Sequence, residues 1–264
     1  MPTAMVTGPN SGIGLRTTLD LARAGFHVVA AGRSPARIHP VIAAITSGGG
    51  SAEYLELDLA SFASIRSAAA RFAESGRPLD ILVNNARVGV NRRGRTQDGF
   101  EVHFGINHLG HFHLTDRLRP TFLPGTRIVS LTSSVHFRAR GINFDKVRNR
   151  TFFIGYQEYA ISKLSNILFI RELARREPGL NAYAVHPGLV DTPLIPRPVR
   201  TVMRANLLTP QQGADTVVWC ATSNEIANQS GRYYQGRAIA TPSPVAEDDD
   251  LARELWERSV EWCR

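Results

Sequence analysis

Short apolar runs alternate with longer amphipathic stretches along the whole chain. The apolar runs are rich in Val, Ile, Leu and Ala and lack a regular polar alternation, which is typical of strands in a parallel sheet covered on both faces. The predicted strands are Thr3–Val6, Val28–Ala31, Tyr54–Leu57, Ile81–Val83, Ile128–Leu131 and Ala182–Val185. The clearest helical stretches are Leu15–Ala24, Ile65–Ala73 and Tyr159–Arg175. This alternation predicts an α/β fold in which a doubly wound parallel sheet lies between two layers of helices.

Helix start signals agree with this pattern. Ser34-Pro35 and Thr209-Pro210 each combine a capping hydroxyl with proline at the first helical position. The acidic run Glu247–Asp250 precedes a last amphipathic stretch, where the helix dipole favours negative charge. No repeat or low-complexity linker interrupts the chain, so we expect a single domain over residues 1–264.

Composition places the chain among ordinary globular proteins. It has 264 residues, of which 43% are hydrophobic and 20% charged. Cys220 and Cys263 are far apart and have no metal-ligand spacing, so we interpret them as two ordinary thiols in a reducing compartment and expect a cytoplasmic protein. We expect no signal peptide and no membrane span, because no stretch reaches the roughly 18 apolar residues that a bilayer requires.

The formal net charge of +8 raises nucleic acid as a partner. The positive charges are scattered, and the basic clusters Asn91–Arg95 and Arg138–Arg140 lack interleaved aromatic residues. We therefore interpret the charge as a solvated surface with some attraction for a polyanionic cofactor, and expect no nucleic acid as the main ligand.

A glycine-rich segment, Thr7–Gly14, follows the first predicted strand and opens the first helix. Such a turn brings backbone N–H groups close to a pyrophosphate, and the helix presents its positive end to the anion. Since glycines alone also occur in ordinary turns, the position between strand and helix carries the prediction of a dinucleotide site. The predicted contacts are Gly8, Asn10, Ser11, Gly12, Ile13 and Gly14.

The end of the second strand bears on the choice of cofactor. An enzyme that uses NAD(H) carries an acid there for the ribose 2′-hydroxyl. This chain has Arg33 followed by Ser34, and a guanidinium can bind a 2′-phosphate that a carboxylate would repel. We predict NADP(H) rather than NAD(H), with a surface arginine as the alternative reading.

Tyr159 and Lys163 are four residues apart in a predicted helix, so their side chains share one face. A free phenol titrates near pH 10, and about 3 to 4 kcal/mol is needed to move it by two to three units. A neighbouring ammonium in a partly desolvated cleft can supply this, which makes the phenol a candidate general acid and base. The motif is weak alone; its place downstream of the glycine-rich segment makes it informative.

Residues with hydroxyl side chains follow the predicted strand that precedes the helix of Tyr159 and Lys163. Ser133 and Ser134 lie just after Ile128–Leu131, where open α/β sheets bind ligands. Either serine could donate a hydrogen bond to a substrate oxygen, and helix capping is the structural alternative for both. His108 and His111 are three residues apart without further ligands, so we interpret them as structural and predict no metal site.

Taken together, TGPNSGIG at Thr7–Gly14, NNA at Asn84–Ala86 and Tyr159 with Lys163 resemble the short-chain dehydrogenase/reductase family. The segments Asp98–Thr115 and Gln229–Pro244 are most similar to its retinol dehydrogenase-like and carbonyl reductase-like branch. The resemblance implies a Rossmann-type oxidoreductase that moves a hydride between a nicotinamide and a carbonyl or alcohol. A catalytically silent dinucleotide sensor or scaffold of the same fold is the alternative.

The resemblance also implies roles for individual residues. Ser134, rather than Ser133, would bind the substrate oxygen, and Asn107 would hold a water that links Lys163 to solvent. Asp58 would contact the adenine, although from the residues alone we favour a helix cap before Ala60–Ala73. The remaining implied cofactor contacts are Leu59, Asn85, Ala86, Tyr159, Lys163, Pro187, Gly188, Val190 and Thr192, with Lys163 positioning the ribose.

One position departs from the family pattern, because Arg87 stands where the NNAG motif has glycine. This arginine could alter the backbone approach to the cofactor or narrow the mouth of the pocket. We expect the loops at about 137–155 and 193–208 to select the substrate, which we predict to be apolar. The resemblance further implies a homodimer or homotetramer.

Overall fold

A computed structural model describes residues 1–191 and 207–264. An eight-stranded sheet with the order β3-β2-β1-β4-β5-β6-β7-β8 forms its centre, and only β8 is antiparallel to its neighbour. The strands are β1 (Thr3–Thr7), β2 (His27–Gly32), β3 (Ser51–Glu56), β4 (Leu79–Asn84), β5 (Phe122–Leu131), β6 (Asn181–His186), β7 (Arg232–Gln235) and β8 (Ala238–Ile239). The predicted doubly wound sheet is confirmed.

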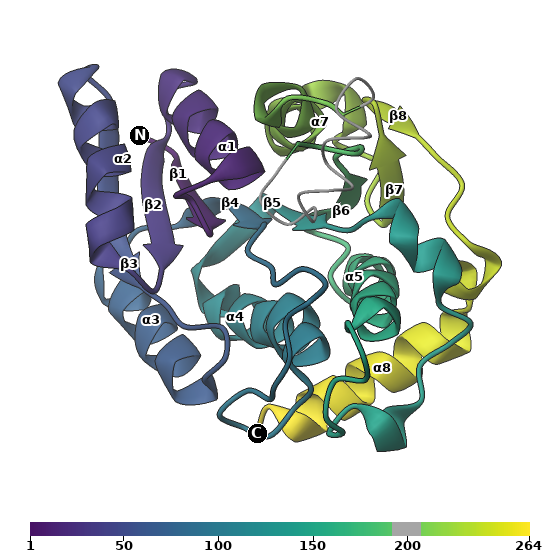
Figure 1. Cartoon of the computed structure of the whole chain (residues 1–264). Coiled ribbons are helices and arrows are strands. Elements are labelled where there is room, and N and C mark those ends of the chain that lie inside the picture. The colour runs from purple at the N-terminus through teal and green to yellow at the C-terminus, as the bar shows by residue number, and fades with distance from the viewer. Residues whose placement is uncertain (192–206) are drawn as a thin grey trace.

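Helices cover both faces of this sheet (Figure 1). One layer holds α1 (Gly12–Arg23), α2 (Pro35–Ser47) and α7 (Pro210–Thr222). The other holds α3 (Phe62–Glu74), α4 (Gly110–Leu118), α5 (Tyr156–Arg176) and α8 (Asp249–Trp262). A π-helical turn, η1 (Phe104–Leu109), leads directly into α4, and a 3₁₀ turn, η3 (Ser134–Arg138), follows β5.

Alternation along β1 explains the two layers. Ala4 and Val6 belong to the core cluster that contains residues of α1 and α7, whereas Met5 belongs to the cluster beneath α3, α4 and α5. Successive side chains of a strand point to opposite faces, so an uninterrupted apolar strand needs a helix layer on each side. The apolar strands predicted from the sequence therefore account for the three-layer arrangement.

Two of the predicted helix starts have full caps. Thr209 and Gln212 form a reciprocal capping box at α7, and the carboxylate of Asp248 accepts hydrogen bonds from two backbone amides at the start of α8. Ser34 occupies the cap position of α2 before Pro35, but its hydroxyl makes no capping hydrogen bond.

The cap predicted at Asp58 is wrong. Helix α3 begins at Phe62, later than expected, and its cap is Ser61, whose hydroxyl accepts from the amide of Ser64. Asp58 instead accepts a hydrogen bond from the amide of Ala60 at 3.0 Å, which closes the turn after β3. Three residues separate Asp58 from the first helical residue, Phe62, and the sequence pattern did not indicate this additional turn.

The last two strands were missed. β7 has only four residues with polar ends, and it joins the sheet because Tyr234 packs edge-on against Tyr183 of β6, with ring centroids 5.7 Å apart. Both cysteines are buried, and burial raises the pKa of Cys220 and of Cys263 to about 12. They are unreactive thiols, as predicted.

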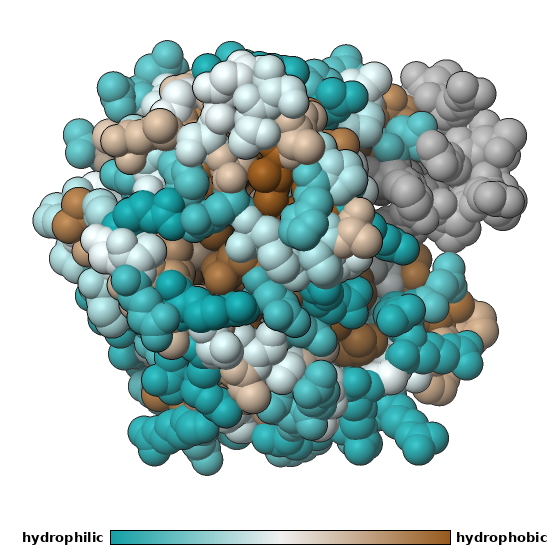
Figure 2. Space-filling model, turned by 90° about the vertical axis from the view of Figure 1, so that its left-hand side faces the viewer, coloured by the Kyte–Doolittle hydropathy of each residue, from teal (hydrophilic) through white to brown (hydrophobic). Residues whose placement is uncertain are grey.

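None of the helices in the described ranges combines the length and hydropathy that a membrane crossing requires. The face of the molecule at the β3 edge of the sheet is largely hydrophilic, and its apolar residues form small patches (Figure 2).

Candidate active site

A cleft of about 330 Å³ opens where β1, β2, β3 and β4 end, at the carboxyl edge of the sheet. Parallel strands place their following loops at one edge, so segments far apart in sequence meet there. Eleven of the predicted cofactor contacts line it: Gly8, Asn10, Ser11, Gly12, Ile13, Gly14, Arg33, Asp58, Leu59, Asn85 and Ala86. Sequence reasoning missed Thr7, Ala31, Gly32, Arg37, Leu57, Val88 and Ile106, which line it as well.

The glycine-rich turn has no room for side chains. Gly8 and Gly12 adopt positive φ angles of 66° and 54°. A Cβ on Gly14 would collide with the carbonyl oxygen of Gly8 and the side-chain amide of Asn85. The loop therefore keeps its backbone open to the cleft, as binding of a pyrophosphate requires.

Thr7 and Asn85 tie this turn to the end of β4. The Thr7 hydroxyl accepts hydrogen bonds from the amides of Asn85 and Ala86 at 3.0 and 2.9 Å. The Asn85 side chain donates to the carbonyls of Thr7 and Gly8 at 2.7 and 3.1 Å. Asn85 thus shapes the cleft through its amide, whereas Ala86 contributes its backbone.

Two arginines line the cleft beyond β2. Arg33 follows the strand directly, and Arg37 lies within the first turn of α2. Both side chains are exposed, so their charge is available to a ligand but screened by solvent. Ser34, predicted beside Arg33, does not line the cleft.

Arg87 reaches into the same cleft from the segment after β4. Its Nε is shielded from solvent and has no hydrogen-bond partner among the described residues. Burial is the main cause that lowers the pKa of Lys163, and the charge of Arg87 is the second. The pKa of His186 is lowered to about 4 by burial first, then by the charge of His136 and then by that of Arg87. The Arg87 side chain thus lines the cleft and adds positive charge to it, an effect that the sequence did not indicate.

The predicted catalytic pair lies on α5. The Nζ of Lys163 is 5.7 Å from the centroid of the Tyr159 ring, so the four-residue spacing brings the groups together as predicted. Lys163 is 1% exposed and donates to the carbonyl of Leu131 at 2.9 Å. Burial, followed by the charge of Arg87, lowers the pKa of Lys163 well below its usual value. The protonated amine of Lys163 therefore relies on nearby hydrogen-bond acceptors and anions for its stability.

The two serines after β5 have different surroundings. Ser133 caps η3, because its hydroxyl accepts from the amide of Val135 at 3.3 Å. The hydroxyl of Ser134 is half-buried and makes no hydrogen bond to another described residue. Ser134 is thus the serine with a hydroxyl left for a ligand, and its implied role in binding the substrate oxygen stays a prediction.

Asn107, in η1, connects the cleft to α5. Its Oδ1 accepts from the amide of Val88 at 2.8 Å, and its Nδ2 donates to the carbonyl of Val88 and to the hydroxyl of Ser162 at 3.1 and 3.0 Å. Ser162 in turn donates to the carbonyl of Tyr159 at 2.8 Å. The expected role of Asn107 in holding a water stays a prediction.

His108 of η1 and His111 of α4 lie in the interior. His111 contacts the Thr7 hydroxyl through Nε2 at 2.9 Å and the Asn107 carbonyl through Nδ1 at 3.1 Å, and His108 contacts the hydroxyl of Ser259 at 3.1 Å. Burial lowers the pKa of His108 to about 3 and that of His111 to about 4. Both are neutral, hydrogen-bonded interior side chains.

The segment after β6 does not line the cleft in the described structure. Gly188 has a φ of 83°, and Val190 forms a bridge with Leu208. Pro187 precedes them, at the same edge of the sheet. Thr192 and most of the predicted loop 193–208 lie outside the described residues.

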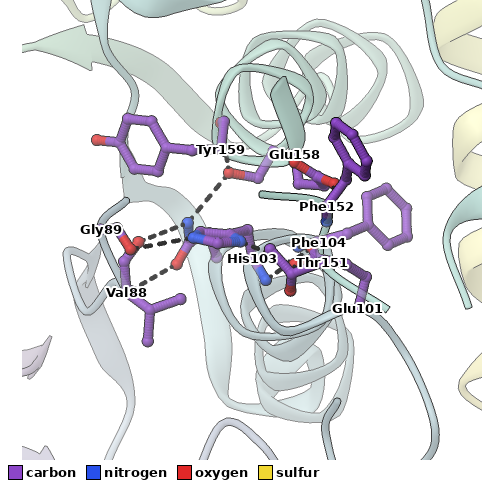
Figure 3. Close-up of polar contacts among 11 residues, drawn as sticks. Val88, Gly89, Glu101, His103, Phe104, Thr151, Phe152, Glu158 and Tyr159 are labelled. Carbon is purple, nitrogen blue, oxygen red and sulfur yellow. Dashed lines mark hydrogen bonds and ion pairs between the residues drawn. The ribbon is translucent and has the colours of Figure 1, made fainter. Parts of the chain in front are cut away.

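A buried polar cluster beside Tyr159 was not predicted at all. Figure 3 shows the ring of His103 between Glu101 and the carbonyl of Gly89, with the phenol of Tyr159 nearby and its hydroxyl directed away from the cluster. The ring centroids of His103 and Tyr159 are 6.2 Å apart at an angle of 79°. No local pattern marked His103, because its contacts with Gly89 and with the start of α5 form only when these segments pack together.

The open glycine turn, the sheet order and the tyrosine–lysine pair define a dinucleotide-binding oxidoreductase fold. The chain belongs to the short-chain dehydrogenase/reductase family, since the family model described as short chain dehydrogenase matches residues 2–200. Its relatives place it in the retinol dehydrogenase-like branch, as the sequence motifs indicated.

Three comparisons are informative. "Dehydrogenase/reductase SDR family member 13" of Bos taurus is 40% identical over 97% of this chain and 72% of the relative. Human "Retinol dehydrogenase 14" is 36% identical over 97% of this chain and 84% of the relative. The crystal structure of a short chain dehydrogenase from Burkholderia cenocepacia in complex with NADP has 27% identity and a TM-score of 0.73, and the match covers 94% of this chain and 98% of that one.

Proposed function

We propose that this protein is an NADP(H)-dependent oxidoreductase that transfers a hydride between the nicotinamide and a carbonyl or alcohol, with Tyr159 as general acid and base. The single observation that carries the proposal is the pairing of Tyr159 with the buried amine of Lys163, 5.7 Å from the ring centroid, next to a cleft with a glycine-rich wall.

The residues of the cleft fit a phosphorylated dinucleotide. Gly14 is packed against the carbonyl of Gly8 and the side-chain amide of Asn85, so a side chain there would force the glycine-rich turn that lines the cleft to move. Arg33 and Arg37 line the cleft beyond β2, where a 2′-phosphate would find two guanidinium groups. The solved relative that contains NADP supports this choice of cofactor.

The cofactor supplies the hydride when bound, and the protein supplies orientation and proton transfer. In the reducing direction Tyr159 gives its phenol proton to the oxygen that becomes an alkoxide, and in the oxidising direction it removes that proton. Ser134 donates a hydrogen bond to the same oxygen as charge develops. Protonated Lys163 stabilises the phenolate that remains.

The names of two relatives indicate the substrate class. Relatives of this chain are named retinol dehydrogenase and polyprenol dehydrogenase, and both names refer to apolar alcohols. We propose an apolar carbonyl or alcohol for this chain as well.

Replacement of the phenol hydroxyl tests the proposal. Tyr159→Phe should lower turnover by roughly 10² to 10⁴ while NADPH still binds, because general acid and base catalysis contributes factors of this size. Turnover is followed by NADPH absorbance with a panel of apolar aldehydes and ketones. Tyr156→Phe, on the exposed start of the same helix, is the matched control and should stay active.

Two results would contradict the proposal. Full activity of Tyr159→Phe would remove the tyrosine from the mechanism. A wild-type protein that binds NADPH but turns over no carbonyl or alcohol would instead favour the silent sensor of the same fold.

A further inference from the structure

His103 makes hydrogen-bonding contacts through both ring nitrogens in a site without solvent access. The side chain is fully buried, with Nδ1 2.8 Å from a carboxylate oxygen of Glu101 and Nε2 3.0 Å from the carbonyl oxygen of Gly89 (Figure 3). A carbonyl oxygen only accepts hydrogen bonds, so Nε2 must carry a proton.

The partner at Nδ1 is an ionised carboxylate. Glu101 accepts from the amides of His103 and Phe104 at 2.8 and 3.0 Å and from the hydroxyl of Thr151 at 2.6 Å. Burial by itself would raise the pKa of Glu101, but the hydrogen bonds from His103, Thr151 and the amide of Phe104, together with the charge of a protonated His103, outweigh it, and the pKa is lowered. Both carboxylate oxygens of Glu101 already accept hydrogen bonds from other donors, so the geometry favours a donor at Nδ1 as well as at Nε2.

This ring lies against the turn that presents the catalytic tyrosine. It contacts Tyr159 edge-on, with centroids 6.2 Å apart. Gly155, with a φ of 73°, is the cap of α5, and its carbonyl accepts from the amide of Tyr159 at 2.9 Å. A Cβ on Gly155 would collide with Cε1 of His103 and lie 2.8 Å from the methyl of Thr151. The start of α5 is thus packed directly on the ring of His103.

The opposite side of the ring holds the wall of the cleft. Its Nε2 binds the carbonyl of Gly89, the residue after Val88, which lines the cleft and is held by Asn107. One buried ring therefore joins the cleft wall after β4 to the helix that carries Tyr159. Its hydrogen bond to Gly89 holds the wall, its packing on Gly155 and Tyr159 holds the helix, and Glu101 fixes the orientation of the ring.

We propose that His103, held as an imidazolium by Glu101, is a positioning residue that sets the phenol of Tyr159 relative to the cleft. This proposal rests on the proposed function. The His103 side chain is fully buried and therefore inaccessible to a ligand, so it acts through the placement of Tyr159.

The charge state is tested without any turnover. In protein with ¹⁵N-labelled histidine at pH 7, we expect two ring N–H resonances from His103, identified by their absence in His103→Gln. A single N–H resonance from this ring would overturn the proposal, whether or not the protein is an enzyme.

The positioning role is tested by kinetics. In His103→Gln the two donor hydrogens share one nitrogen, so the bonds to Glu101 and Gly89 cannot both keep the geometry that the ring gives them. Tyr159 should therefore shift, and kcat should fall about tenfold or more, since small misplacements of catalytic groups have effects of this size. The affinity for NADPH, measured by titration of the free protein, should not change. Glu101→Gln should behave in the same way.

His113→Leu is the matched control, because His113 is also a fully buried histidine but packs on Phe62 of α3, with ring centroids 5.0 Å apart. It should keep the wild-type kcat. If His103→Gln does not fold, Thr151→Val removes one hydroxyl donor from Glu101 and should lower kcat to a smaller extent.

A folded His103→Gln with wild-type kcat would overturn the proposal, and so would an equal loss of kcat in His113→Leu. Tyr159→Phe separates this failure from that of the proposed function. An inactive Tyr159→Phe beside a fully active His103→Gln rejects only the positioning role, whereas an active Tyr159→Phe rejects the role of the tyrosine itself.

Discussion

The side chain of Asn107 binds both backbone polar groups of Val88, accepting from its amide at 2.8 Å and donating to its carbonyl at 3.1 Å. This pair of hydrogen bonds fixes the segment after β4, including the neighbouring Arg87, against the helix layer. The position of Arg87 in the cleft is therefore held by buried backbone contacts, and its charge has a defined place beside Lys163.

Arg87→Gly restores the glycine of the family motif and should weaken the binding of NADPH and NADH by the same factor. A guanidinium in the cleft can bind phosphate oxygens that both cofactors share, and a charged hydrogen bond of about 1.5 kcal/mol corresponds to roughly tenfold in affinity. Titration of the protein with each cofactor measures the two affinities. Arg16→Gly, at an exposed position of α1, is the control. Tighter binding by Arg87→Gly would show that the arginine obstructs the cleft.

Arg33→Ala should weaken NADPH binding about tenfold and leave NADH binding unchanged, because only NADPH carries the phosphate that this exposed guanidinium would bind. The ratio of the two dissociation constants is the measurement. The two cofactors thus separate the roles of these arginines. Arg33 would bind the 2′-phosphate, which only NADPH carries, and Arg87 would bind phosphate oxygens that NADPH and NADH share. Equal losses for NADPH and NADH in Arg33→Ala would remove the argument for NADP(H).

Gly14→Ala should abolish cofactor binding or lower the melting temperature, because the new methyl would collide with the Gly8 carbonyl and the Asn85 amide. Backbone and a hydrogen-bonded amide give way less readily than a flexible side chain. Gly179→Ala is the control, since a Cβ there meets nothing within 4 Å. Unchanged NADPH affinity and stability in Gly14→Ala would show that the turn is looser than described.

Acid should destabilise the fold below pH 6.5. Burial is the main cause that lowers the pKa of His108 to about 3 and those of His111, His113 and His186 to about 4. Between pH 4 and 6.5 the unfolded chain binds protons that the folded chain does not, so stability is complete above 6.5 and falls as the pH drops towards 4. Urea midpoints at pH 7 and pH 5 measure this loss.

His113→Leu should reduce the loss between pH 7 and pH 5, because it removes one of these groups. Both ring nitrogens of His113 lack partners among the described residues, so no hydrogen bond is lost in the exchange. Identical pH sensitivity of the variant and the wild type would contradict the assignment.

Several features of the site could be predicted because they depend on short stretches of chain. Gly8 and Gly14 belong to one turn between a strand and a helix, and Tyr159 and Lys163 meet because four residues make about one helical turn. The capping box of Thr209 and Gln212 is local in the same way. The cap at Asp58 failed because a serine three residues later competes for the same helix start.

By itself the sequence determined the doubly wound fold, the glycine turn and the tyrosine–lysine pair, since periodicity and spacing act over a few residues. Only the tertiary structure decided that Arg87 enters the cleft, that Thr7 binds Asn85 across 78 residues, and that His103 joins Gly89 to the start of α5. Such partners are selected by the packing of the sheet edge, where burial leaves a polar group few acceptors and donors to choose from.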